Sequence, residues 1–383
     1  MKISAMRMIS GFAALAAIGL SVAADAAPTA TSRIVNAANA FLATLDEKQR
    51  QTVLFAFDDK QQRVRWSNFP TGFVPRGGIS LKEMNPAQRS AAMALVSSAL
   101  SAKGFEKVQQ IMDGDEVNKL NEANNPPFGN NGPPGRNGSG PPPGGVNGPP
   151  PGIGANRPPF NADSSTLFGK DLYYVSILGT PSEKNPWMLQ FGGHHLALNV
   201  TIAGERGVLT PTLTGAQPAL YAVNGKTVRP LAQESDKALT LLQALDEQQR
   251  KQAVLSYQLA DLVLGPGQDG KTIVPEGLKA SAMTEHQRAL LLDVISEWAN
   301  IIHEDAAATR MAELTADINE TWFAWSGPTT GTAGKNITAY YRIQGPHLVI
   351  EYAPQPLGAD PAMHVHTMYR DPTNDYGQRL TKK

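Results

Sequence analysis

Two stretches of the chain place apolar residues three or four positions apart, the spacing of an α-helix. These apolar positions are Met93, Val96, Leu100, Leu291, Ile295 and Trp298. Asn85 before Pro86 is a good N-cap followed by proline at the first helical position. Thr284 and Gln287 form a capping-box pattern before the second stretch. Both stretches therefore predict helices with defined starts.

After Gly193, the two sets of alternating positions differ in polarity. This period of two predicts a strand, because successive side chains of a strand point to opposite faces. One face would carry His194, Leu196, Leu198, Val200 and Ile202, and the other His195, Ala197, Asn199 and Thr201. His194 thus shares an apolar face, which favours a core or supporting role. His195 lies on the polar face, where it is available for chemistry.

Four segments of the first half recur in the same order in the second half. The matched pairs are Leu45–Arg50 with Leu245–Arg250, Met84–Arg89 with Met283–Arg288, Tyr174–Gly179 with Trp322–Gly327, and Gly193–Asn199 with Gly345–Glu351. We therefore predict an α+β fold with an internal duplication and a pseudo-twofold axis. Each half, residues 27–222 and 223–383, would consist of helices followed by antiparallel strands.

The N-terminus has the three parts of a secretory signal peptide. Lys2 and Arg7 precede the apolar run Ile9–Ala23, and Ala24–Ala26 supplies a small-x-small cleavage site. The alternative is an uncleaved membrane anchor, for which the run is short. We predict that residues 1–26 are removed and that the protein is exported, to the periplasm or the medium.

Charge and cysteine content narrow the classes of function. The chain has 34 basic and 34 acidic residues, and loss of Lys2, Arg7 and Asp25 with the leader leaves 32 and 33, a net charge of −1. Such a balance argues against nucleic acid as a partner. The absence of cysteine excludes disulfides and thiolate metal sites. No later stretch is long and apolar enough for an integral membrane anchor.

Asn124–Pro159 is a low-complexity segment. Its 36 residues include 12 proline, 10 glycine and 7 asparagine. Such a composition buries too little apolar surface to offset its ordering entropy, so we predict a disordered insert. The alternative is a ligand for a proline-recognising partner.

The C-terminal region is the densest in potential chemistry. On a strand, His364 and His366 would point to the same side, and His-x-His pairs suit divalent metals. Asp371 and Asp375 follow at turn signals and could add oxygen ligands or orient an imidazole. Arg370 could hold an anionic group. The alternatives are a network that pins the C-terminal tail to the body and an acid/base site without a metal.

The matched strand segments add two histidines and a carboxylate to these candidates. His195 corresponds to His347, which shares its predicted face with Glu351. One hypothesis is a metal-dependent hydrolase with His195, His347, His364 and His366 as nitrogen ligands, more than one site needs. Glu351 or Asp371 would be a ligand or general base, and Arg370 would stabilise anionic charge. The cofactor would be a divalent metal.

Several of these segments together resemble the bacterial DUF3500 family. They are Arg65–Asn68, Gln88–Arg89, Trp187–Leu196 with its Gly-Gly-His-His-Leu run, and His366–Asp371. The resemblance covers almost the whole mature chain except the insert. It implies a fold unit and an exported lineage but no chemistry, because the family is named for having no assigned function.

A second hypothesis is a non-catalytic binding module for a small molecule or polymer, with the ligand in a cleft between the halves. Trp66, Trp187, Trp322 and Trp325 could line such a cleft, although core packing is expected for at least one of the last two. The chain has no phosphate-binding loop, dinucleotide-binding glycine motif or Gly-x-Ser-x-Gly elbow. Convergence of the histidines would favour the metalloenzyme, and their dispersal the binding module.

Overall fold

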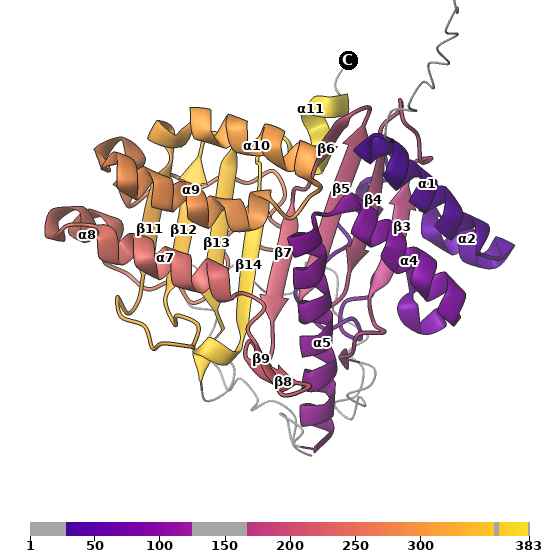
Figure 1. The fold of residues 1–383 in the computed structure, drawn as a ribbon, viewed down its shortest axis with the longest axis horizontal. Coiled ribbons are helices and arrows are strands. Elements are labelled where there is room, and N and C mark those ends of the chain that lie inside the picture. The colour runs from indigo at the N-terminus through magenta and orange to yellow at the C-terminus, as the bar shows by residue number, and fades with distance from the viewer. Residues whose placement is uncertain (1–27, 125–166, 356–359, 382–383) are drawn as a thin grey trace, which may run out of the picture.

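Helices cover one face of a large sheet, as Figure 1 shows. The computed structural model describes residues 28–124, 167–355 and 360–381. The helices are α1 (Ala30–Ala43), α2 (Glu47–Val53), α3 (Lys60–Arg63), α4 (Pro86–Ala99), α5 (Ala102–Asn124), α7 (Ala232–Ala244), α8 (Glu247–Ala253), α9 (Glu285–Ala299), α10 (Glu304–Ala316) and α11 (Gln378–Thr381). The predicted leader, residues 1–26, and all but the first residue of the predicted insert lie outside the described residues.

The sheet has 12 strands in the order β1-β3-β4-β5-β7-β14-β13-β12-β11-β10, with β2 paired to β3 and β6 to β5. The strands are β1 (Leu54–Phe55), β2 (Ile79–Ser80), β3 (Tyr174–Leu178), β4 (Trp187–Gly192), β5 (Leu196–Ala203), β6 (Arg206–Val208), β7 (Thr212–Ala216), β10 (Leu278–Lys279), β11 (Trp322–Ser326), β12 (Tyr340–Gly345), β13 (Leu348–Pro354) and β14 (Val365–Arg370). A separate hairpin joins β8 (Tyr221–Val223) and β9 (Lys226–Val228). All pairs in the large sheet are antiparallel except β1 with β3.

The local signals in the sequence produce the helix starts that they predict. Asn85 caps α4 with Pro86 at its first position, and Thr284 caps α9 in a capping box with Gln287. Each of the two helices also carries a buried glutamine that reaches the C-terminal end of an earlier helix. Gln88 Nε2 donates to Thr44 O at 2.9 Å, and Gln287 Nε2 donates to Ala244 O at 2.8 Å. The same contact between one helix and the end of an earlier helix therefore occurs twice in the chain.

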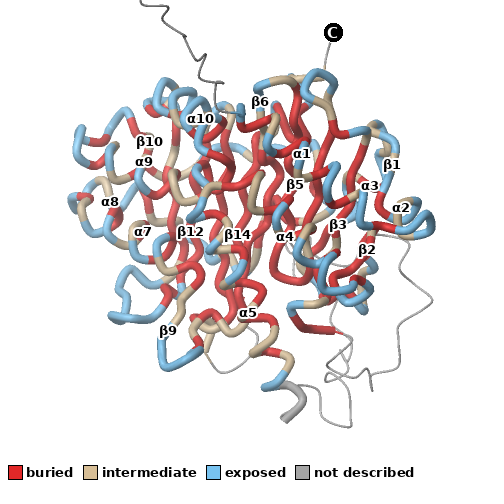
Figure 2. The backbone as a smooth tube through the Cα atoms, turned by 45° about the vertical axis from the view of Figure 1, so that its right-hand side comes forward, coloured by how far each residue is buried: buried red, intermediate tan, exposed pale blue. Residues whose placement is uncertain are grey.

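The alternation predicted for β5 places its two faces against different neighbours. Leu196, Leu198, Val200 and Ile202 belong to the main core beneath the helices. Ala197 lies on the other face, in a smaller cluster with Trp66, Leu213, Leu262, Tyr340, Ala353 and Met368. Figure 2 shows that the central strands are buried along their length. The chain is thus a mixed helix-and-strand protein whose sheet is covered on both faces.

Two strands from distant parts of the sequence form the centre of the sheet. β7 and β14 pair along their length, and Thr214 Oγ1 and Thr367 Oγ1 lie 2.6 Å apart across the pair. We call this pair the seam, because it joins the strands of residues 27–222 to those of 223–383. Within the described ranges, no helix is both long enough and apolar enough to cross a bilayer.

Candidate metal centre

Four histidines gather at the end of the sheet where β5 and β14 begin and β7 ends. His364 Nε2 lies 3.2 Å from His195 Nε2 and 3.0 Å from His366 Nε2. The His194 ring packs against the His195 ring at a tilt of 32°, with 3.8 Å between centroids. The four histidines, which we call the histidine centre, are between 0 % and 6 % exposed. Two histidines from the first half of the chain and two from its C-terminal region thus lie together in one enclosed part of the structure.

The register of the seam brings these side chains together. His366 pairs with Gly215 of β7, whose neighbour Thr214 pairs with Leu196 at the start of β5. A Cβ atom on Gly215 would lie 3.1 Å from His366 Cδ2 and 3.2 Å from His195 Cδ2. Both distances are tighter than ordinary carbon contacts. Glycine at this position therefore leaves the room in which the two imidazoles face each other.

Helix α5 supplies a carboxylate that orients one of the rings. Asp115 Oδ1 lies 2.5 Å from His195 Nδ1, and Tyr173 donates its hydroxyl to Asp115 Oδ2 at 2.6 Å. An ionised carboxylate only accepts hydrogen bonds, so His195 Nδ1 carries a proton and Nε2 is the nitrogen that faces His364. A histidine held by a carboxylate in this way is the usual arrangement behind a metal ligand.

Burial favours the neutral form of His194, His364 and His366. It lowers the pKa of His364 to about 2, with a smaller contribution from the neighbouring His195. It also lowers the pKa values of His194 and His366 well below the ordinary 6.5. Neutral imidazole is the form that binds metals. At neutral pH these three imidazoles therefore offer nitrogen lone pairs rather than positive charges.

Hydrogen bonds among the rings cannot satisfy all of the imidazole nitrogens. A neutral imidazole nitrogen has one proton or one lone pair, so His364 Nε2 cannot bond fully with both His195 and His366. The Nδ1 atoms of His194 and His364 are buried and have no hydrogen-bond partner in the described part of the chain. Two imidazole nitrogens on one tetrahedral zinc ion lie about 3.3 Å apart, given bonds of about 2.0–2.1 Å. The observed separations are close to that value.

Two overlapping ligand sets are available. One nitrogen from each of His194, His195 and His366 lies within 4.8 Å of the others. The shortest contacts instead join His195, His364 and His366 through their Nε2 atoms. We give more weight to the second set, because the Asp115 bond fixes the direction of His195 Nε2. His195 and His366 belong to both sets.

Comparison with known proteins assigns the chain to a family. Residues 27–378 match the family described as "Protein of unknown function (DUF3500)". The chain belongs to this family. No curated protein and no solved structure matches the chain. The resemblance carried by the Gly-Gly-His-His-Leu run is thus confirmed, and the DUF3500 description leaves the chemistry to be argued from the site.

One predicted metal ligand of this DUF3500 chain lies away from the histidine centre. His347 precedes β13, so it sits at the opposite end of the sheet and its side chain is 37 % exposed. Its Nδ1 lies 3.0 Å from Thr373 Oγ1, and its Nε2 lies 3.9 Å from Asp317 Oδ2. The structure therefore brings together His195, His364 and His366, but not His347.

Glu351 does not join the histidine centre, and both of its oxygens are hydrogen-bonded to other groups. It accepts hydrogen bonds from the backbone N–H groups of Val263 and Leu264 at 2.7 and 2.8 Å, and from the Tyr340 hydroxyl at 2.7 Å. Burial raises its pKa, while these hydrogen bonds act in the opposite direction. This arrangement anchors the loop before β10 to the sheet.

Arg370 and Asp371 belong to the C-terminal network that the sequence offered as an alternative. Arg370 donates to Leu264 O and Gly265 O and pairs with Asp375 at 2.8 Å. Asp371 pairs with Arg310 at 3.2 Å. Burial raises the pKa of Asp375 to about 6. These groups hold the tail against the body at the end of the sheet opposite the histidine centre.

The tryptophans do not form a common cleft. Trp187 and Trp325 are fully buried, and Trp325 stacks on Tyr341 with 6.0 Å between centroids. Trp66 is buried and donates its indole N–H to Tyr376 at 2.9 Å. Trp322 is half-buried beside Lys279. Core packing, the expectation for at least one of Trp322 and Trp325, is confirmed for Trp325.

Sequence reasoning missed three members of the site. Asp115 and Tyr173 carry no motif, and only the fold brings α5 and the residue before β3 to His195. His194 was assigned to the apolar face of a strand, but β5 begins only at Leu196. Its ring is therefore free to turn toward His195. The doubled histidine in Gly193–Leu196 was the one available signal for its role.

Proposed function

We propose that this protein binds one divalent transition-metal ion, zinc or copper, at the histidine centre. The observation that carries the proposal is the convergence of the Nε2 atoms of His195, His364 and His366, with Asp115 behind His195. Imidazole ligands without thiolates suit zinc and copper. His194 is a candidate fourth ligand, because one of its ring nitrogens lies within 4.8 Å of nitrogens of His195 and His366.

The proposed ion links the two parts of the chain. Asp115, His194 and His195 come from residues 27–222, whereas His364 and His366 come from residues 223–383. A metal that binds only the folded chain adds its binding free energy to folding stability. The ion would therefore stabilise the seam at the end where β7 finishes.

Metal binding is better supported than hydrolysis at this site. A hydrolytic metal keeps an open coordination position and needs a base near its bound water. Glu351 and Asp371 are engaged elsewhere, and both oxygens of Asp115 are already hydrogen-bonded. The four histidines are nearly inaccessible in the described structure. We therefore propose a closed, tightly held ion rather than the catalytic metal of a hydrolase.

Elemental analysis after incubation with zinc or copper and dialysis without chelator tests the proposal. We expect about one equivalent of metal per chain. Asp371→Ala is the matched control, since this variant changes a buried carboxylate at the far end of β14 and should keep the metal. If wild-type protein retains neither zinc nor copper, the proposed metal-binding function is wrong.

We also propose that the two parts of the chain arose by duplication and are related by a pseudo-twofold axis at the seam. Equivalent contacts support this proposal, including those of Gln88 and Gln287. Leu100 and Ile302, which follow matching helices, form an antiparallel bridge with each other. The strand orders β3-β4-β5-β7 and β11-β12-β13-β14 mirror each other about the seam. A single rotation should superpose these strands, and failure to do so in an experimental structure would refute the duplication.

An Asp–His pair occupies matching places in the two parts. Asp115 in α5 faces His195 before β5, and Asp317 at the end of α10 faces His347 before β13. Only the first pair meets further histidines. Under the proposed duplication, one copy of an ancestral pair became the buried metal centre and the other stayed near the surface.

We also propose that the protein is exported. This proposal is supported by the signal-peptide pattern of residues 1–26 and by the start of the family match at residue 27. Mass spectrometry of the protein recovered from the secreted and periplasmic fractions of a bacterial host should give a chain that begins at Ala27. A full-length chain retained in the cytoplasm would contradict it.

A further inference from the structure

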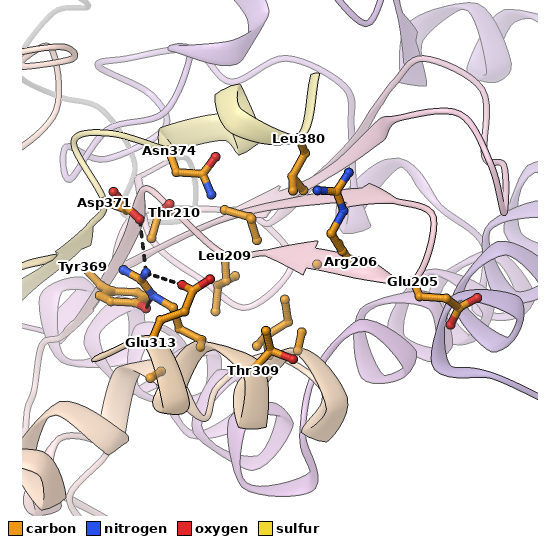
Figure 3. Close-up of a pocket in the computed structure, with 16 residues that line it drawn as sticks. Glu205, Arg206, Leu209, Thr210, Thr309, Glu313, Tyr369, Asp371, Asn374 and Leu380 are labelled. Atoms are coloured by element: carbon orange, nitrogen blue, oxygen red, sulfur yellow. Dashed lines mark hydrogen bonds and ion pairs between the residues drawn. The ribbon is translucent and has the colours of Figure 1, made fainter. Parts of the chain in front are cut away.

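A cavity of about 110 Å³ lies at the end of the sheet opposite the histidine centre. Figure 3 shows it between α10, β6 and the C-terminal residues. Its apolar lining includes Leu209, Ala299, Ile302, Ala306 and Leu380. None of the four histidines of the histidine centre lines this cavity, so the two sites are separate.

The acidic groups at one end of the cavity are neutralised by arginine. Arg310 pairs with Glu313 at 3.0 Å and with Asp371 at 3.2 Å, and donates to the Tyr369 hydroxyl at 3.0 Å. Asp371 also lies 3.4 Å from Arg379. The dashed lines in Figure 3 mark the two ion pairs of Arg310. This end is therefore fixed and presents no unpaired negative charge.

One cation on the cavity wall is unpaired. Arg206 is exposed and has no ion-pair partner among the residues that the structure describes. Its chain neighbour Glu205 points away from it in Figure 3. The figure also shows the Asn374 amide, Leu380 and the Arg206 guanidinium along one side of the cavity. Arg206 therefore offers one unpaired positive charge to an anion on this side of the cavity.

Two further polar groups have unused hydrogen-bonding capacity. Thr210 is 2 % exposed, and its Oγ1 has no hydrogen-bond partner in the described structure. Asn374 accepts from the Arg379 backbone N–H through Oδ1 at 2.8 Å, which leaves its Nδ2 as a donor. A buried hydroxyl without a partner is costly unless something fills the role. Both groups line the cavity.

We propose that this cavity binds a small monocarboxylate with a hydrocarbon body. The carboxylate would accept hydrogen bonds from Arg206 and Asn374, since guanidinium groups recognise carboxylates through paired donors. The hydrocarbon body would lie on Leu209, Ile302 and Ala306. One water needs roughly 10–15 Å³ of such space, so a cavity of about 110 Å³ has room for a ligand of several non-hydrogen atoms. Hexanoate is a short probe of this kind.

Ligand-observed NMR on the purified protein tests the proposal with hexanoate, hexan-1-ol and hexylammonium. We expect binding of hexanoate in clear preference to the neutral and cationic probes. Arg206→Gln should weaken hexanoate binding roughly 10- to 100-fold, the contribution of a hydrogen bond to a charged group. Arg65→Gln, which changes another exposed arginine, should leave it unchanged.

Two results would overturn the carboxylate site. One is equal binding of hexan-1-ol and hexanoate, because charge would then play no part. The other is hexanoate binding that is absent in the wild type or unaffected by Arg206→Gln. Binding to a metal at the histidine centre would be insensitive to Arg206, so the variant separates the two sites. Ala306→Phe, with a melting curve as its folding control, should also abolish binding by filling the cavity.

Discussion

His366→Ala is expected to abolish stoichiometric metal binding. His366 belongs to both possible ligand sets, and its Nε2 lies 3.0 Å from His364 Nε2. Structural zinc sites bind with about 10–16 kcal/mol shared over four ligands, so one ligand is worth on the order of 100-fold or more in affinity. A competition titration against a chromophoric chelator, with zinc and with copper, measures this loss.

The same variant should lose the metal-dependent part of its thermal stability. For wild-type protein, free metal at about 1,000 times Kd adds roughly 4 kcal/mol, which raises Tm by several degrees. His347→Ala is the matched control, since its imidazole lies near the surface at the other end of the sheet. Equal metal affinity in wild type and His366→Ala, or a loss confined to His347→Ala, would refute the assignment.

Glu351→Ala is expected to cost about 3–5 kcal/mol of folding stability. The substitution leaves two backbone N–H groups and the Tyr340 hydroxyl without their buried acceptor. Each such unsatisfied group costs about 1–3 kcal/mol. Urea denaturation of the metal-loaded protein measures the loss, and metal content should stay unchanged because Glu351 does not contact the histidine centre.

Glu247→Ala provides the comparison for this effect. Glu247 pairs with Lys251 at 2.8 Å, and both side chains are largely exposed. Removing an exposed ion pair costs about 0–1 kcal/mol. If Glu351→Ala lost its metal at unchanged stability, the original hypothesis of Glu351 as a ligand or general base would regain support.

Local features of the fold could be predicted from the sequence because their causes are local. The cap at Asn85 and the capping box at Thr284 depend on residues within one helical turn. The two faces of β5 follow from simple alternation. His364 and His366 are two positions apart, and their convergence followed from the same geometry.

The rest of the site depends on contacts between distant segments. The pairing of β7 with β14 brings His366 beside Gly215, and no pattern within either strand indicates this partner. Asp115 is one of many acidic residues, and only the course of α5 marks it out. His347 matches His195 in sequence but lies just before β13, which places it at the opposite end of the sheet.

X-ray absorption spectroscopy of the metal-loaded protein tests the central claim most directly. We predict a first shell of about three or four nitrogen ligands at about 2.0–2.1 Å from zinc, with the outer-shell scattering of imidazole rings. This signal should persist in Asp371→Ala and disappear in His366→Ala. A shell composed of oxygen alone, or an imidazole signal that survives in His366→Ala, would contradict a metal ion at the histidine centre.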